Sequence, residues 1–135
     1  MSAQACAEID TIVAAFYAAF DNRAARAPAV PELRGMFAGH ARVTRVSGGG
    51  VESWSVDEFI APRAAMLTDG TLLDFHEWET ESNTTVTGNI ASRRSQYRKT
   101  GTLNGSVVAG GGRKFIQLCR IDGRWMISSV LWEDG

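Results

Sequence analysis

The sequence has few of the residues that mark a disulfide scaffold, a metal centre or a nucleic-acid-binding surface. It contains 2 Cys and 2 His in 135 residues, and its formal net charge is −1. Cys6 and Cys119 each sit in an apolar pattern, so we expect reduced thiols in a cytoplasmic protein and no disulfide framework. Without a basic excess, the chain has no general field that attracts nucleic acid or an anionic membrane. We therefore expect neither nucleic acid nor a membrane as a partner.

Long apolar runs are missing as well. No stretch approaches the ~20 apolar residues needed to cross a bilayer. The alanine-rich start lacks a basic segment, and Glu8 and Asp10 interrupt it, so it is not typical of a signal peptide. Hydrophobic residues at 44% and charged residues at 21% are typical of a soluble globular protein, and the length predicts one domain over residues 1–135.

The N-terminal segment has apolar residues at every third or fourth position, the spacing of one face of a helix. This pattern predicts an amphipathic helix over residues 3–22. Its apolar stripe consists of Ile12, Val13, Phe16, Tyr17 and Phe20. A proline in the first turn favours a short helix over residues 31–37. A capping box formed by Ser55 and Glu58 predicts a third helix that runs to residue 67.

The remaining segments predict strands. Residues 41–46 and 51–54 flank a triple glycine, and a long hairpin over 72–102 turns at Gly88-Asn89. Residues 105–112 are interpreted as a loop or the frayed start of a strand. The last two strands, 114–121 and 125–133, are joined by Asp122-Gly123, a strong hairpin signal. Helices followed by an antiparallel meander predict an α+β domain in which the sheet curls over the helices.

The long hairpin carries most of the candidate chemistry, because alternate residues share a face. One face holds Asp74, His76, Trp78, Thr80 and Ser82, and the other holds Phe75, Glu77, Glu79 and Glu81. Burying three carboxylates costs several kcal/mol each unless they are paired, so the face with His76 and Trp78 is the expected cavity lining. The alternative is the face with Phe75, on which one neutralised glutamate is tolerated and Glu79 and Tyr97 form a polar pair inside the cone.

The register of this hairpin has two alternatives. A two-residue turn places Glu79 opposite Arg98 and Glu81 opposite Gln96. One more residue in the turn places Glu79 opposite Tyr97 and Glu81 opposite Ser95 instead.

Five segments, taken in order, resemble the nuclear transport factor 2-like superfamily and, within it, the SnoaL-like small proteins. They are IVAAFYAAFD, LRGMFAGHARVTRV, FHEWE, GNIASRRSQY and GRWMISSVLWED. The resemblance implies a cone-shaped α+β barrel, in which a strongly curved, mostly antiparallel sheet wraps three helices and leaves a pocket. It also implies a homodimer through the outer sheet face. Members include steroid isomerases, dehydratases, polyketide cyclases, epoxide hydrolases and binding domains, so the fold leaves the reaction open.

None of these catalytic sets is complete in the sequence. The position of the isomerase base falls near Arg45, which is a cation. Asp21 and His76 match two dehydratase positions, but the second histidine is missing. Asp74 and Arg93 match part of the Asp-Arg-Asp set of epoxide hydrolases, without a second carboxylate.

The leading hypothesis is a protein that binds a small hydrophobic or cyclic molecule in a largely apolar pocket. One alternative is a lyase, isomerase or dehydratase-type enzyme that uses His76 with Asp21 or Tyr97 on a cyclic or polyketide-like compound. Another is a non-catalytic dimerisation or accessory domain with a filled cone. No cofactor or metal is expected, because His40 and His76 are far apart and no ligand spacing accompanies them. The candidate ligand-binding residues are Tyr17, Trp54, Phe59, His76, Trp78, Glu79, Arg93, Tyr97 and Trp132.

Overall fold

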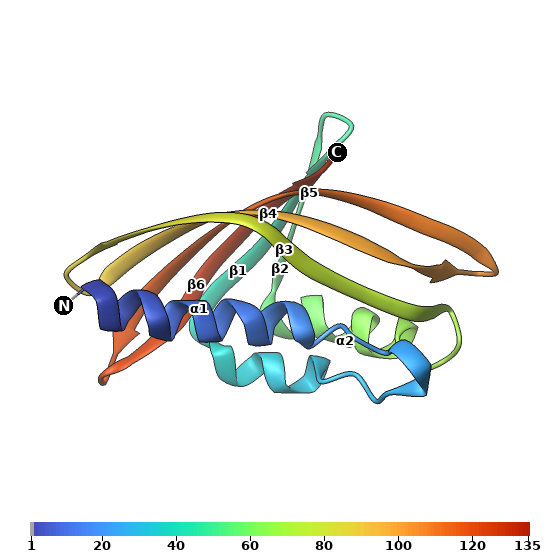
Figure 1. Cartoon of the computed structure of the whole chain (residues 1–135), viewed down its shortest axis with the longest axis horizontal. Helices are drawn as coiled ribbons and strands as arrows, with labels where there is room; N and C mark the ends of the chain where they lie inside the picture. Colours follow the sequence, from blue (N-terminus) through green and yellow to red (C-terminus); the bar gives the residue numbers. More distant parts are fainter. Residues whose placement is uncertain (1) are drawn as a thin grey trace.

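A six-stranded sheet covers the helices of this protein on one side, as seen in a computed structural model that describes residues 2–135 (Figure 1). The helical elements are α1 (Ser2–Ala18), the 3-10 helices η1 (Arg23–Ala25) and η2 (Val30–Met36), and α2 (Val56–Met66). The strands are β1 (Phe37–Ser47), β2 (Gly50–Ser55), β3 (Leu72–Thr87), β4 (Ile90–Leu103), β5 (Ser106–Ile121) and β6 (Arg124–Asp134). The prediction of an α+β domain is confirmed.

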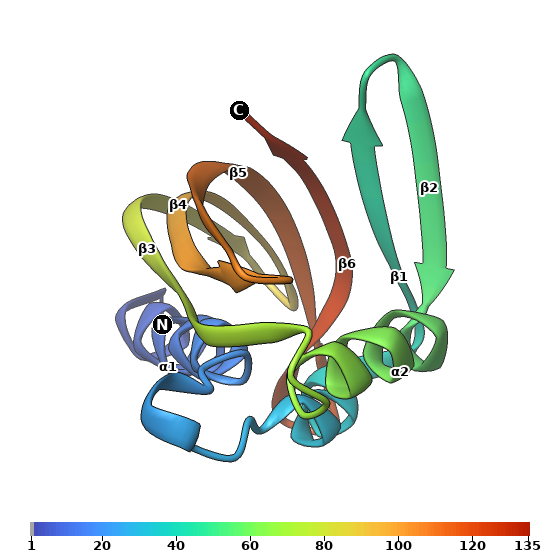
Figure 2. The ribbon, with the colours of Figure 1, turned by 90° about the vertical axis from the view of Figure 1, so that its right-hand side faces the viewer.

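The strands follow the order β2-β1-β6-β5-β4-β3 across the sheet. Neighbouring strands are antiparallel except β1 and β6, which run parallel. Figure 2 shows how strongly the sheet curls, with α1 below β3 and β4 and α2 below β1 and β2. The sheet does not close, and its concave face covers the helices, which confirms the cone-shaped arrangement.

The predicted apolar stripe of α1 forms the centre of the core. Val13 and Phe16 are each only 1% exposed, and Tyr17 and Phe20 are also buried. The Phe16 ring meets the rings of Tyr17 and Phe20 edge-on, with centroids 5.5 and 5.6 Å apart. Burying a large apolar side chain stabilises the fold by roughly 1.5–3 kcal/mol, so this stripe holds α1 against the sheet.

The first helix ends four residues before the predicted end, because Asn22 makes hydrogen bonds with other segments. Its side-chain amide donates to the backbone oxygens of Leu67 (2.9 Å) and Leu72 (2.8 Å). Its Oδ1 accepts a hydrogen bond from the backbone N–H of Phe75 (2.7 Å). Asn22 therefore joins the segment after α1 to the end of α2 and the start of β3.

Several other boundaries also differ from the prediction. The second helix is a 3-10 helix that begins at Val30, and the first strand begins at Phe37, so His40 lies within β1. The glycine-rich segment after Gly105 is a full part of β5. A Cβ atom added to Gly112 would collide with the backbone of Glu133, so the glycine allows β5 to lie close to β6. The third helix opens with the predicted capping box.

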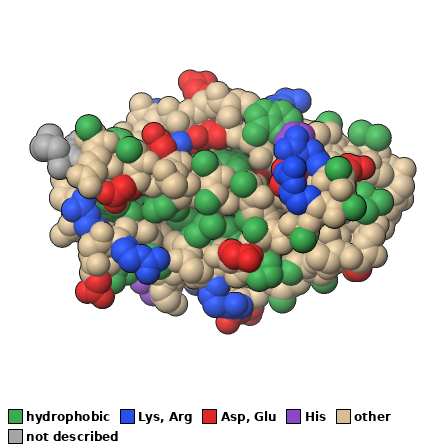
Figure 3. Space-filling model, turned by 60° about the horizontal axis from the view of Figure 1, so that its bottom comes forward, with side chains coloured by type: hydrophobic (Ala, Val, Ile, Leu, Met, Phe, Trp, Pro, Cys, Tyr) green, Lys and Arg blue, Asp and Glu red, His purple; other side chains and the backbone are tan. Residues whose placement is uncertain are grey.

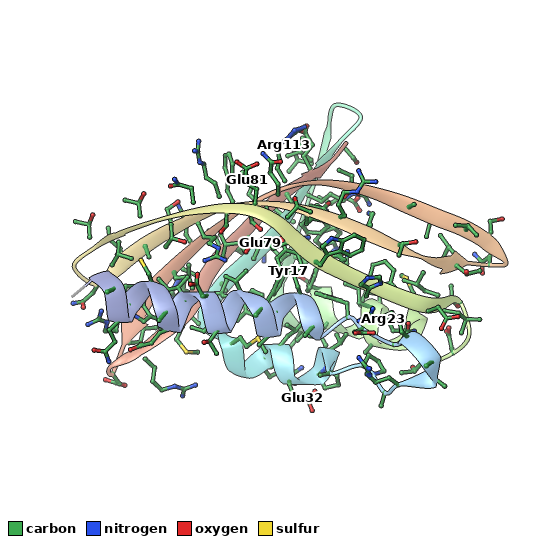
Figure 4. The ribbon with its side chains drawn as sticks, in the orientation of Figure 1. Tyr17, Arg23, Glu32, Glu79, Glu81 and Arg113 are labelled. Atoms are coloured by element: carbon green, nitrogen blue, oxygen red, sulfur yellow. The ribbon has the colours of Figure 1, made fainter. Side chains whose placement is uncertain are left out.

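β3 contains an irregularity that decides which side chains face the helices. The two-residue turn pairs Glu81 with Gln96, whereas Glu79 pairs with Tyr97, so Thr80 is an extra residue between them. One extra residue in a strand moves every side chain beyond it to the opposite face of the sheet. Glu79 therefore lies on the side of β3 that faces Tyr17, and Glu81 lies on the opposite side (Figure 4). The register of the two-residue turn is confirmed for Glu81, and the register with one more residue is confirmed for Glu79.

None of the helices within residues 2–135 is long and apolar enough to cross a membrane. Figure 3 shows the helical side of the molecule. Hydrophobic side chains gather along the middle of this face, and positive and negative side chains are interspersed around them. This mixture agrees with the formal net charge of −1.

Candidate functional site

A cavity of about 330 Å³ lies between the concave face of the sheet, the second half of α1, and α2. Most of its wall is apolar. The aromatic residues of the wall are Phe16, Phe20, Phe59, Phe75 and Trp132. The ring of Trp132 meets Phe59 edge-on at 5.9 Å and stacks at 5.8 Å on Trp54, which lies behind it. The cavity therefore has an aromatic lining supplied by α1, the turn that follows it, α2 and the sheet.

Charged side chains line part of the same cavity, and most of them form ion pairs. Lys114 Nζ lies 3.4 Å from Glu77 Oε1, with both side chains largely buried. Asp134 Oδ2 lies 3.2 Å from Lys99 Nζ and 3.6 Å from an Arg45 nitrogen. These five residues come from β1, β3, β4, β5 and β6, so the curl of the sheet brings them together.

Burial shifts the pKa values of these groups. Burial lowers the pKa of the Lys114 ammonium, and the nearby Glu77 carboxylate opposes this shift. The Lys114 ammonium also lies 4.0 Å from the centroid of the Tyr97 ring, a cation–π contact. The pKa of Asp134 is below its usual value: burial acts to raise it, but a hydrogen bond from Tyr97 and the charge of Lys99 outweigh burial.

A second polar network lies between α1 and β4, outside the cavity wall. Arg93 donates from Nε and Nη2 to the Glu79 carboxylate at 3.2 and 2.5 Å, and it also bonds to Asp10 on α1. Ser95 Oγ lies 2.5 Å from Glu79 Oε2 and 2.7 Å from the Tyr17 hydroxyl. The candidates Tyr17, Glu79 and Arg93 therefore connect α1 to the sheet, and they do not line the cavity.

The prediction that the His76 face lines the cavity is wrong. Phe75 and Glu77 line it instead, and His76 stacks on Trp78 on the other face of β3 with ring centroids 4.5 Å apart. Trp78 is 40% exposed. The physical reason is that the carboxylates that turn inward have cationic partners, such as Lys114 for Glu77, and pairing offsets the cost of burial.

The three candidate catalytic residues are not brought to one place. Asp21 follows α1 and binds Arg23 and Arg26, and the hydrogen bond from Arg23 lowers the pKa of Asp21 to about 2. The Tyr97 hydroxyl donates to Asp134, and His76 faces away from the cavity. The acid–base role of His76 with Asp21 or Tyr97 stays a prediction.

Two of the predicted ligand-binding residues, Phe59 and Trp132, lie in the cavity wall. The charged wall residue Lys114 is absent from the sequence-based candidates. The sequence nevertheless indicates this position, because Lys114, Ile116 and Leu118 are alternate residues of β5 and share its buried face. A lysine on the buried side of a strand is uncommon unless it is paired, so this position marks a polar group in the core.

No family model matches the sequence, and no curated protein matches it. Solved structures do match it over nearly its whole length. A nuclear transport factor 2-like superfamily protein from Salmonella enterica serovar Typhimurium aligns with a TM-score of 0.80 and 14% identity, over 99% of this chain and 93% of that one. This chain has the nuclear transport factor 2-like fold.

Other structures with the same fold are similar. A nuclear transport factor 2-like protein of unknown function from Silicibacter pomeroyi aligns with a TM-score of 0.67 and 20% identity, over 100% of this chain and 99% of that one. A protein of unknown function with a cystatin-like fold from Nostoc punctiforme aligns with a TM-score of 0.68 and 18% identity, over 95% and 89% of the two chains. The predicted resemblance to the nuclear transport factor 2-like superfamily is confirmed at the level of the fold.

Proposed function

We propose that this protein binds a small, largely apolar, cyclic molecule inside its cone. The observation that carries the proposal is the aromatic cavity of about 330 Å³, with a few charged groups on one part of its wall. Sites for small molecules have this composition and start at about 300 Å³. An accessory domain with a filled cone would have side chains in this space, so the cavity favours binding over that alternative.

Binding of an uncharged fluorescent dye tests the proposal. N-phenyl-1-naphthylamine is apolar and aromatic, and its emission rises when it leaves water for an apolar site. Two adjacent residues of β5 offer a matched pair of variants. Val108 lines the cavity, whereas Val107 is 79% exposed and does not.

We expect the dye to bind saturably to the wild-type protein and to Val107→Trp. The indole of Val108→Trp fills part of the cavity, so this variant should bind the dye about tenfold more weakly or not at all, corresponding to about 1.4 kcal/mol or more. Equal binding by both variants would show that the dye lies elsewhere. No saturable binding by the wild-type protein would refute the proposal.

We also propose that the protein is cytoplasmic. Two copies associate there through the outer face of the sheet. Phe115 on β5 and Leu131 on β6 are direct neighbours on this face and are 48% and 43% exposed. These two adjoining apolar side chains support an interface on this face, because contact with a second copy would remove them from water. Light scattering after size-exclusion chromatography should give the mass of two chains, and Phe115→Glu should give the mass of one chain. A wild-type protein that stays at one chain at high concentration would contradict the dimer.

A further inference from the structure

One cation of the cavity wall has no carboxylate within ion-pair distance in the part of the chain that the structure describes. Arg63 on α2 lines the cavity and is half-buried. Among residues 2–135 it forms no ion pair, although the other three cations of the wall each lie beside Glu77 or Asp134. The wall thus holds four cations and two carboxylates.

The Arg63 side chain is held in place by aromatic rings. Its guanidinium carbon lies 4.0 Å from the centroid of the Phe59 ring, 5.2 Å from that of Trp54 and 5.6 Å from that of Trp132. One nitrogen, Nη1, donates to the backbone oxygen of Phe59 at 3.2 Å. A planar guanidinium packed against ring faces has a fixed orientation, so its remaining donors point in a defined direction.

Most donors of Arg63 are available. A guanidinium has five N–H groups, and within residues 2–135 only the bond to Phe59 uses one of them. No nitrogen of Arg63 is both fully buried and without a hydrogen-bond partner. The nitrogens that do not bind Phe59 are therefore accessible from the cavity or the solvent. Burial lowers the pKa of Arg63, and the charges of Glu77 and Glu52 oppose this shift without cancelling it.

We infer that the ligand of the cone is a ring-bearing carboxylic acid, and that Arg63 binds its carboxylate while its ring lies among the aromatic residues of the wall. This inference rests on the proposed function and names its ligand class. A carboxylate accepts two parallel N–H bonds from a guanidinium. It also brings the net charge of the wall closer to zero, whereas an uncharged ligand leaves the Arg63 donors unpaired beside apolar surface.

A matched pair of compounds tests the inference by isothermal titration calorimetry. 2-Naphthoate and 2-naphthamide have the same ring system and nearly the same shape, and they differ in the charge of one group. We expect the wild-type protein to bind 2-naphthoate about 10- to 100-fold more tightly than 2-naphthamide, as charge-assisted hydrogen bonds predict. Arg63→Met keeps an apolar stem against Phe59, and it should abolish this preference.

Two further variants serve as controls for the role of the Arg63 guanidinium. Arg63→Lys keeps the charge without the planar fork, so we expect it to keep part of the preference. Arg98→Met removes an exposed arginine from the other face of β4, and it should leave the preference unchanged.

The other outcomes separate the two proposals. Equal binding of 2-naphthoate and 2-naphthamide by a wild-type protein that still binds N-phenyl-1-naphthylamine would overturn the inference and leave the proposed function intact. A preference for the acid that persists in Arg63→Met would overturn the role of Arg63. Tighter binding of 2-naphthyl phosphate than of 2-naphthoate would overturn the choice of a carboxylate. Absence of binding by the dye and by both naphthalene compounds would overturn the inference and the proposed function together.

Discussion

Removing one partner of the buried Glu77–Lys114 pair should strongly destabilise the protein. The two charged atoms are 3.4 Å apart, and the side chains are only 13% and 7% exposed. At this distance and an effective dielectric constant of about 20, the attraction is about 5 kcal/mol. In Glu77→Gln the Lys114 ammonium stays buried without its ion-pair partner, so the free energy of unfolding should fall by about 3–5 kcal/mol.

The Arg113–Glu133 pair provides a control that differs mainly in burial. Its charged atoms are 3.5 Å apart, but both side chains are about half exposed. Glu133→Gln should therefore lower the free energy of unfolding by less than about 1 kcal/mol. Urea denaturation at pH 7 measures both variants in the same assay.

The double variant Glu77→Gln/Lys114→Met separates a charge effect from a packing effect. Because it removes both charges, it should recover most of the stability that Glu77→Gln loses. A Glu77→Gln variant that loses less than about 1 kcal/mol would refute this reasoning. So would a double variant that loses the sum of the two single effects.

The pH dependence of Glu77→Gln gives a second check. Glu77 acts to raise the pKa of Lys114. Removal of Glu77 therefore lowers the pKa of Lys114 in the folded protein further below its pKa in the unfolded chain. Between these two pKa values the unfolded chain binds more protons, and the free energy of unfolding therefore rises with pH. The stability deficit of Glu77→Gln should shrink as the pH increases toward 10, the range of an ordinary lysine.

Three further predictions concern the fold around the site. Asn22→Ala leaves three buried backbone groups without their partner and should lower the free energy of unfolding by about 3 kcal/mol in urea, whereas the exposed Asn83→Ala should change it little. The stabilisation from Asp21, whose pKa falls from 3.8 to about 2 on folding, is present above pH 4 and is lost as the pH falls toward 2; the stability of Asp21→Asn should therefore show a weaker acid dependence in this range. Gly112→Ala should cost about 1–3 kcal/mol because its Cβ meets backbone, while Gly110→Ala, whose Cβ meets nothing closer than 3.9 Å, should stay within about 0.5 kcal/mol in thermal unfolding. Equal effects within either matched pair, or parallel acid curves for Asp21→Asn and the wild-type protein, would contradict the packing described here.

The order of helices and strands could be predicted because it depends on local patterns. The spacing of Val13 and Phe16 predicted the buried face of α1, and Ser55 and Glu58 predicted the start of α2. The predicted end of α1 was wrong because Asn22 bonds to residues about 45 or more positions away. A pattern within one helix contains no information on such partners.

The face of β3 that lines the cavity could not be predicted for a related reason. Thr80 gives no sign in the sequence that it is an extra residue, yet it places Glu79 and Glu81 on opposite faces. The cost of burying Glu77 also depends on Lys114, which lies on a strand that is not adjacent to β3. The aromatic wall residues Phe59 and Trp132 were predicted because large apolar side chains in these elements are usually buried.

A crystal structure of the protein grown with N-phenyl-1-naphthylamine tests the central claim most directly. We expect density for the dye among Phe16, Phe59 and Trp132, with the ion pair of Glu77 and Lys114 intact beside it. A cone closed by its own side chains, with the dye absent or bound on the outer face of the sheet, would contradict it.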